Sequence, residues 1–276
     1  MSGTHKNTLL QVSGLSIGFS QYMKGTQKRI VRPISGLHVD IGEGEIVAVV
    51  GASGSGKSLL AHAVLGILPG NAICSGSIVY KGEELTQTRK EQLRGREIAF
   101  IPQSVNYLDP LMSVGRQVRI GLDRATAKAQ QEKLFAQYGL KKSDGRLLPF
   151  ELSGGMLRRV LFATSVREGV KLVIADEPTP GIHPQALSEI LKQLKQFAEN
   201  GAGVMLITHD IMSALEIADR VAVIKDGATV EISEVSAFTG KGEALKTEYT
   251  QRLWRTLPQN DFDLEFQEEG GRATWR

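Results

Sequence analysis

The chain has 276 residues, of which 41% are hydrophobic and 23% charged, and its formal net charge at neutral pH is +3. These values are typical of a soluble globular protein with one large or two modest cores. No stretch approaches the roughly 18 consecutive apolar residues of a membrane-spanning helix. The single cysteine, Cys74, excludes an internal disulfide and any cysteine-based metal cluster. The charge is mild, basic residues are scattered, and aromatic residues make up 6%, all of which argue against a nucleic-acid-binding face.

The first third of the chain predicts strands around one glycine-rich loop. The opening MSGTHKNTLL lacks the layout of a secretory signal, so we expect a cytosolic protein. Strands are predicted over 9–19 and 35–51, and the second ends in an apolar run that suits a strand buried on both faces. A helix over 59–68 and a strand over 76–85 follow.

The remainder alternates between strands and helices, apart from one helical insertion. Residues 104–165 are rich in Ala, Gln, Lys and Arg at helical spacing, so they predict a helical subdomain inserted in an α/β chain. We therefore expect one domain over 1–260 and a C-terminal tail over 261–276. The elements predicted after the insertion are strands over 171–176, 203–210 and 220–227 and helices over 185–200 and 211–219.

The stretch GASGSGKS matches the phosphate-binding pattern G-x-x-x-x-G-K-[ST] with Gly51, Gly56, Lys57 and Ser58. Glycines let backbone N–H groups approach the phosphates, the lysine supplies a positive charge, and the serine hydroxyl reaches Mg²⁺. A chance glycine-rich turn is the alternative, but a buried strand before the loop and an apolar helix after it disfavour that interpretation. We include Ser53, Gly54 and Leu60 among the expected nucleotide-binding positions.

Two further segments extend this chemistry. The strand KLVIAD ends in Asp176, which is placed to hold Mg²⁺, and Glu177 follows it, where it could orient an attacking water or accept its proton. In ELSGGM, Ser153 suits a helix N-cap and Gly154-Gly155 leave the first-turn N–H groups bare, which predicts a second anion site. One chain with two such helix starts favours a composite site shared between subunits.

With these motifs in this order, the chain resembles the ATP-binding cassette ATPases over nearly its full length. By that resemblance, Gln103 in FIPQ is the Q-loop residue, Leu152 to Met156 are the signature, and His209 in LITHD is the switch histidine. The family also places an aromatic residue against adenine, for which we take Phe19, with Tyr22 as the competitor.

The resemblance implies a P-loop NTPase fold: a RecA-like mixed sheet, an N-terminal antiparallel β subdomain and the inserted helical subdomain. It implies ATP and Mg²⁺ as cofactors. The implied catalytic residues are Glu177, His209 and Gln103, and the implied metal ligands are Ser58, Gln103 and Asp176. It further implies a peripheral position on the cytoplasmic face of the membrane.

A finer resemblance concerns the cargo. Residues 94–118 and 248–262 are similar to segments of the oligopeptide, dipeptide and nickel importer ATPases, and the second of them is closer to the nickel and opine-metallophore branch. The implied partners are two membrane permeases, a second ATPase or another copy of this chain, and indirectly an extracytoplasmic solute-binding protein. Nickel–metallophore complexes and short peptides both stay open as cargo.

The chain departs from the family at three places. Arg158-Arg159 stands where relatives have Gln-Arg, which we interpret as an exposed helix face, and Phe150 replaces a usual His. In the D-loop, Ile182-His183 replaces Leu-Asp. Since no other His or Cys lies at ligand spacing, we interpret His183 as a residue of the dimer seam. The replaced aspartate couples the two ATP sites in the family, so His183 puts that coupling in question. Two alternatives to an active importer subunit stay open: a partly degenerate cassette that serves a second ATPase, or a soluble ATPase outside transport.

Overall fold

The computed structural model describes residues 7–22, 28–178 and 184–257. The strands are β1 (Thr8–Tyr22), β2 (Lys28–Gly42), β3 (Ile46–Gly51), β4 (Ala72–Tyr80), β5 (Glu83–Glu84), β6 (Ile98–Ile101), β7 (Leu172–Asp176), β8 (Gly203–Thr208), β9 (Arg220–Lys225) and β10 (Ala228–Glu234). The α-helices are α1 (Lys57–Leu65), α2 (Gln87–Leu93), α3 (Val114–Arg119), α4 (Ala127–Gln137), α5 (Gly154–Ser165), α6 (Pro184–Glu199), α7 (Ile211–Leu215) and α8 (Glu248–Arg255). Short 3₁₀ turns lie at Val105–Tyr107, Lys142–Arg146, Pro149–Glu151 and Val235–Ala237.

The central sheet has six strands in the order β10-β9-β3-β8-β7-β6. All neighbouring pairs are parallel except β10 with β9. Every residue of β3, β7 and β8 is buried, because both faces of the sheet are covered. Residues Val47 and Val49 join one apolar cluster and Ala48 and Val50 the other, as the two-residue period of a strand requires. The mixed sheet agrees with the predicted fold class.

A second, four-stranded antiparallel sheet has the order β2-β1-β4-β5. Its buried residues, such as Leu10, Ile17 and Ile34, share an apolar cluster with α1 and with one face of the central sheet. The N-terminal antiparallel part that the sequence predicts is therefore present, and it packs over the central sheet.

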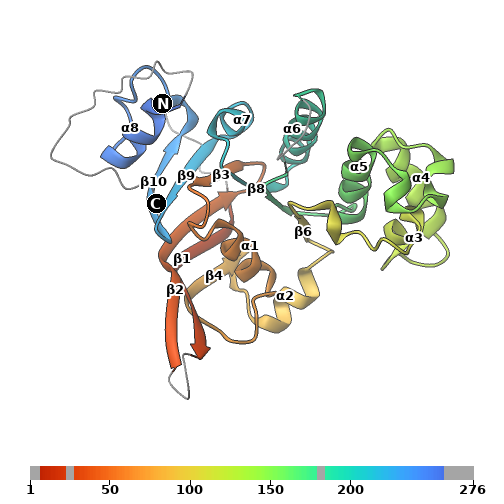
Figure 1. Cartoon of the computed structure of the whole chain (residues 1–276), viewed down its shortest axis with the longest axis horizontal. Helices are drawn as coiled ribbons and strands as arrows, with labels where there is room; N and C mark the ends of the chain where they lie inside the picture. The colour runs from red at the N-terminus through yellow and green to blue at the C-terminus, as the bar shows by residue number, and fades with distance from the viewer. Residues whose placement is uncertain (1–6, 23–27, 179–183, 258–276) are drawn as a thin grey trace.

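The helical segment, defined here as residues 105–165, contains α3, α4 and α5 and no strand, and the structure describes all of it. Figure 1 shows these helices gathered on one side of the molecule, and α8 on the other. Buried side chains such as Val114, Phe135 and Phe162 join the helical segment to the second face of the central sheet. That residues 104–165 form an inserted subdomain, and the division of the chain into domains, stay predictions.

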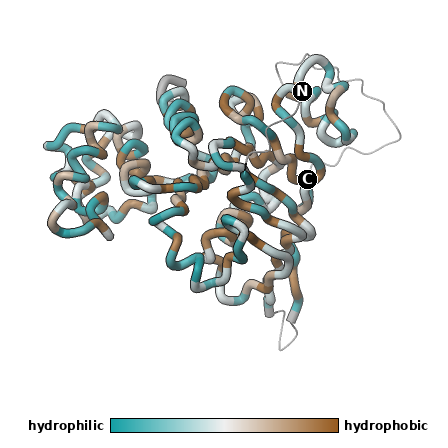
Figure 2. The backbone as a smooth tube through the Cα atoms, turned by 180° about the vertical axis from the view of Figure 1, so that it is seen from behind, coloured by the Kyte–Doolittle hydropathy of each residue, from teal (hydrophilic) through white to brown (hydrophobic). Residues whose placement is uncertain are grey.

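Several element bounds differ from the prediction. The strand expected over 35–51 is two strands, because the chain turns at Gly44, whose φ of 64° is a left-handed value that favours glycine. Strands β6 and β10 and helices α2 and α8 were not predicted. Figure 2 shows hydrophobic colour following the strands. Among the residues that the structure describes, no helix is long and apolar enough to cross a membrane.

Candidate nucleotide site

The glycines of the loop after β3 are required by geometry. A Cβ atom at Gly51 would lie 2.2 Å from the carbonyl oxygen of Ile224 on β9. Gly54 and Gly56 have φ values of 80° and 95°, which L side chains rarely adopt. The loop therefore lies against the edge of the sheet with its backbone exposed to a ligand, as the phosphate-binding pattern predicts.

Lys57, the first residue of α1, folds back over this loop. Its Nζ atom donates to the carbonyl oxygens of Gly51, at 2.9 Å, and Ala52, at 3.0 Å. Only 5% of the residue is exposed. Burial lowers the pKa of the Lys57 ammonium, and the nearby carboxylates of Glu177 and Asp176 partly oppose that effect. The lysine is thus held at the loop, where it would meet a phosphate.

Ser58 and Asp176 come together from α1 and the end of β7. The Ser58 hydroxyl donates to Oδ1 of Asp176 at 3.1 Å. Burial raises the pKa of the Asp176 carboxyl, while the hydrogen bond from Ser58 acts in the opposite direction. A hydroxyl beside a carboxylate is an oxygen donor pair of the kind that Mg²⁺ prefers, so these residues fit the predicted metal. Among the described residues there is no group of three or more His, Cys, Asp and Glu side chains that could hold a metal by themselves.

Glu177 lies at the centre of a second cluster. Its Oε2 accepts a hydrogen bond from Nε2 of Gln103 at 3.3 Å and lies 3.1 Å from Nδ1 of His209. Gln103 follows β6, Glu177 follows β7 and His209 follows β8, so three adjacent parallel strands deliver them to one edge of the sheet. Gln103 contacts Glu177, and its predicted role as a metal ligand stays a prediction.

The backbone of Glu177 is unusual. Its φ of 42° is left-handed, and its N–H donates to the carbonyl oxygen of Ile207 on β8 at 2.8 Å. A non-glycine residue in this region costs on the order of 1–3 kcal/mol and persists where the surroundings enforce it. Here the strain turns the carboxylate toward Gln103 and His209.

The helix start at Ser153 has the predicted cap. The Ser153 hydroxyl accepts a hydrogen bond from the Met156 N–H at 3.3 Å, and α5 begins at Gly154. Ser153, Gly154 and Gly155 are all exposed. In Figure 1 the start of α5 belongs to the helical segment and lies away from α1, so the structure does not bring these residues to the phosphate loop of the same chain.

The remaining predicted residues have mixed outcomes. Phe19 lies on β1, is half-buried and packs against the apolar cluster under the antiparallel sheet. The side chain of its competitor Tyr22 and the whole of His183 lie outside the described residues, so neither choice is tested. Ser53 is exposed on the loop, as expected. Leu60 does not join the site, because its side chain is wholly buried and its N–H donates to the Gly56 carbonyl.

Two residues near the site were missed. The Ser55 hydroxyl is buried inside the loop and has no hydrogen-bond partner among the described residues. Only its place within the loop pattern could have indicated this residue from the sequence.

Arg158 is half-buried and donates from Nη1 to the carbonyl oxygen of Gln103 at 2.9 Å. The interpretation of Arg158-Arg159 as an exposed helix face is therefore wrong, because both side chains are half-buried on main-chain carbonyls.

Known proteins share both the sequence pattern and the fold. A family model described as "ABC transporter" matches residues 34–180. The peptidoglycan transport ATP-binding protein YejF of Agrobacterium fabrum is 34% identical, covering 95% of this chain and 49% of its own length. The oligopeptide transport ATP-binding protein OppD of Bacillus subtilis is 33% identical over 82% of this chain and 66% of its own length. The dipeptide transport ATP-binding protein DppD of Escherichia coli is 31% identical over 93% of this chain and 80% of its own length. The chain thus spans about half to four fifths of these relatives, and none of the three names nickel.

Solved structures agree on the fold. A dimeric ATP-binding cassette in a post-hydrolysis state with ADP and Pi has a TM-score of 0.70 at 22% identity, covering 82% of this chain and 99% of that one. The cbiO1 protein from Clostridium perfringens, part of an ABC transporter complex, has a TM-score of 0.67 at 27% identity, covering 84% and 90%. Both the matched family model and the relatives point to one conclusion: this chain belongs to the ABC transporter family.

Proposed function

We propose that this chain is the ATP-hydrolysing subunit of an ABC importer for short peptides. The observation that carries the proposal is the cluster at the ends of β6, β7 and β8. There, Gln103 and His209 both contact the Glu177 carboxylate, beside the Ser58–Asp176 pair. Five side chains of the required types meet beside one phosphate-binding loop, which is the arrangement that phosphoryl transfer to water needs.

Each group has a role that its position supports. The loop glycines and Lys57 would hold the phosphates, and the Ser58 hydroxyl and Asp176 would hold Mg²⁺, with Gln103 nearby. When bound, Mg²⁺ neutralises charge on the phosphate oxygens. Glu177 would accept the proton of the attacking water, and His209 and Gln103 would orient that carboxylate. Phe19 would contact the adenine.

The signature residues support a dimer. Ser153, Gly154 and Gly155 form an exposed helix start that is separate from the chain's own phosphate loop. An exposed helix start with bare N–H groups favours a phosphate, and a second subunit would supply one. The partner is either another copy of this chain or a second ATPase, and the two would close head to tail on ATP.

Apolar side chains on the helical segment support a permease contact. Leu111 is 87% exposed and Phe150 71%, both in the turns that flank the helices. Large apolar side chains left open to solvent are suited to contact a partner protein. We therefore propose that each ATPase of the dimer contacts one permease subunit through this segment, two permeases in all, at the cytoplasmic face of the membrane. The cargo proposed here is a short peptide, because the relatives are named for oligopeptide, dipeptide and peptidoglycan transport.

The test replaces Glu177 with glutamine. In cells lacking this chain, the parent gene should restore uptake of a radiolabelled dipeptide, and Glu177→Gln should not. The purified Glu177→Gln chain should bind ATP as the parent does and hydrolyse it at least ~100-fold more slowly, since a general base contributes about that factor or more. Glu189→Gln, which removes the same charge from an exposed position on α6, is the matched control and should behave as the parent.

Two results would contradict the proposal separately. Hydrolysis by Glu177→Gln at the parental rate would remove the role given to Glu177. Restored uptake of a nickel–metallophore complex without restored dipeptide uptake would replace the cargo and leave the ATPase intact.

A further inference from the structure

Two neighbouring arginines on α5 make different contacts. Arg159 donates to the carbonyl oxygens of Gly139, at 3.2 Å, and Gly155, at 3.4 Å, so it binds within the helical segment. Arg158 donates out of the helical segment, to the carbonyl oxygen of Gln103 at 2.9 Å. Burial lowers the pKa of the Arg158 guanidinium from its high ordinary value, and the group remains a charged donor at neutral pH.

This contact completes a continuous chain of hydrogen bonds from α5 to the reaction centre. Arg158 holds the main chain of Gln103, the side chain of Gln103 donates to Glu177 at 3.3 Å, and Glu177 contacts His209 at 3.1 Å. The amide of Gln103 reaches Glu177 only if the backbone that carries it stays in place. A charged donor on the Gln103 carbonyl fixes that backbone more firmly than a neutral donor would.

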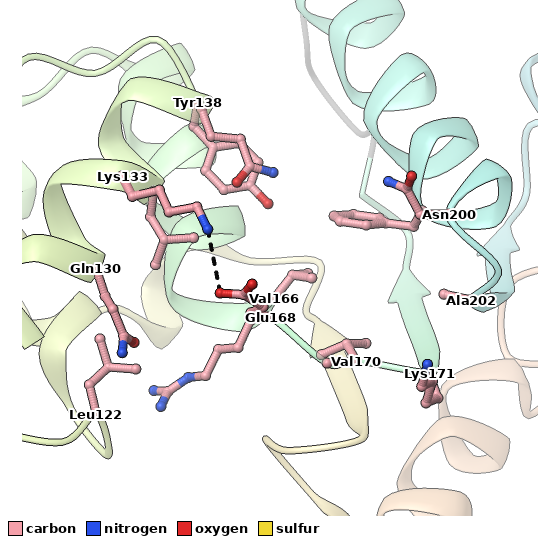
Figure 3. Close-up of a pocket in the computed structure, with 15 residues that line it drawn as sticks. Leu122, Gln130, Lys133, Tyr138, Val166, Glu168, Val170, Lys171, Asn200 and Ala202 are labelled. Atoms are coloured by element: carbon pink, nitrogen blue, oxygen red, sulfur yellow. Dashed lines mark hydrogen bonds and ion pairs between the residues drawn. The ribbon is translucent and has the colours of Figure 1, made fainter. Parts of the chain in front are cut away.

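The far side of the helical segment is attached more loosely. A cavity of about 350 Å³ separates α4 from the end of α6. Figure 3 shows Tyr138 and Lys133 on one side of this cavity and Asn200 and Ala202 on the other. Lys133 and Glu168 form an ion pair of 3.4 Å there, and both side chains are largely exposed. Arg158 belongs to the same segment, so a shift of the helical segment at this cavity would also act on its contact with Gln103.

We propose that Arg158 is a positioning residue for ATP hydrolysis: it holds the backbone of Gln103 so that the Gln103 amide stays on the Glu177 carboxylate. The inference rests on the proposed hydrolysis and adds the residue that couples α5 to it. Arg158 does not touch the nucleotide in this account. A displacement of α5, for example by a partner bound to the helical segment, moves Gln103 and so changes the orientation of the carboxylate.

The test compares Arg158→Gln with a matched control, Arg167→Gln. Arg167 is also half-buried, has its pKa lowered by burial, and donates to a distant main-chain carbonyl, that of Ile120, but it does not contact Gln103. The full chain is assayed for kcat and KM with MgATP, and hydrogen exchange is measured at the amides of residues 103–107.

Arg158→Gln should lower kcat about tenfold with KM within about twofold, because the loss falls on alignment and not on binding. It should also speed exchange at residues 103–107. Arg158→Lys, which keeps a charged donor, should recover part of kcat. Arg167→Gln should match the parent in kcat and in exchange at these amides, whatever its effect on melting temperature.

Equal kcat and equal exchange for Arg158→Gln and Arg167→Gln would overturn the proposal, as would a loss confined to KM. If the parent hydrolyses no ATP, the proposed function fails, and the exchange measurement still decides whether Arg158 holds Gln103.

Discussion

The C-terminal segment (residues 238–257) and the helical segment lie beyond opposite edges of the central sheet, next to β10 and β6, and they are attached differently (Figure 1). The first is fixed by a buried carboxylate, because Glu231 on β10 accepts hydrogen bonds from Ser233, from the Lys246 N–H and from both the N–H and hydroxyl of Thr247. The second is joined by apolar packing, by Arg158 and Arg167, and by one exposed ion pair beside a cavity. We infer that the helical segment shifts at a lower free-energy cost than the C-terminal segment.

The largest effect on stability is expected at Glu231, which attaches the C-terminal segment. Glu231 is 5% exposed; burial alone would raise the pKa of its carboxyl, but the four hydrogen bonds it accepts outweigh burial and lower that pKa to about 2. Glu231→Gln should therefore reduce the free energy of unfolding by about 3 kcal/mol at pH 7, because the folded pKa of about 2 lies below the ordinary value of 4.5. Urea unfolding at pH 7 measures this loss.

The pH dependence of the same variant sharpens the prediction. Because the folded pKa lies below the unfolded one, the stabilisation is complete above about pH 5 and is lost as the pH falls toward 2. The difference between parent and Glu231→Gln should shrink over that range. A difference that is constant from pH 7 to pH 3 would show that the carboxylate charge does not fix α8.

A smaller effect on stability, of opposite sign, is expected at Tyr138, which lines the cavity between α4 and the end of α6. The Tyr138 hydroxyl is buried with no hydrogen-bond partner among the described residues, and burial raises the pKa of the phenol. Tyr138→Phe removes that uncompensated polar group and keeps the ring on Phe162, so it should stabilise the chain by about 0.5–1 kcal/mol. A lower melting temperature for Tyr138→Phe than for the parent would mean that the hydroxyl has a partner in solution.

The smallest effect is expected at the ion pair beside the cavity. The Lys133 and Glu168 side chains are 70% and 89% exposed, so solvent screens their attraction. Lys133→Ala should change the free energy of unfolding by less than about 0.5 kcal/mol. A loss of more than about 1 kcal/mol by thermal or urea unfolding would contradict the loose attachment on this side.

Strands β3, β7, β8 and β9 of the central sheet were predictable because burial on both faces leaves an uninterrupted apolar run, as in β3 and β7. The central-sheet strands β6 and β10 were not predicted. Edge strands carry weaker signals. β2 starts at Lys28, earlier than predicted, in a stretch with Arg29, Arg32 and Pro33, and β10 alternates with polar residues. Both lie at the edge of a sheet, where charge and proline are tolerated.

The candidate site also contains residues that could be predicted from the sequence and residues that could not. Asp176 ends a buried strand, and Glu177 and His209 directly follow buried strands, so the edge they share could be predicted from their order along the chain. Arg158 could not be found by such reasoning, because its partner Gln103 lies 55 residues away and meets it only once α5 is packed. Leu60 was misplaced because a residue next to the loop in sequence turned into the core in space.

The left-handed backbone at Glu177 has a consequence for evolution. Selection for stability alone would favour glycine at this position, or asparagine, because both adopt a φ of 42° at less cost than glutamate. Under the proposed function, the chain keeps a conformationally costly residue at position 177 for the sake of its carboxylate. Stability and activity would then favour different residues at this one peptide unit.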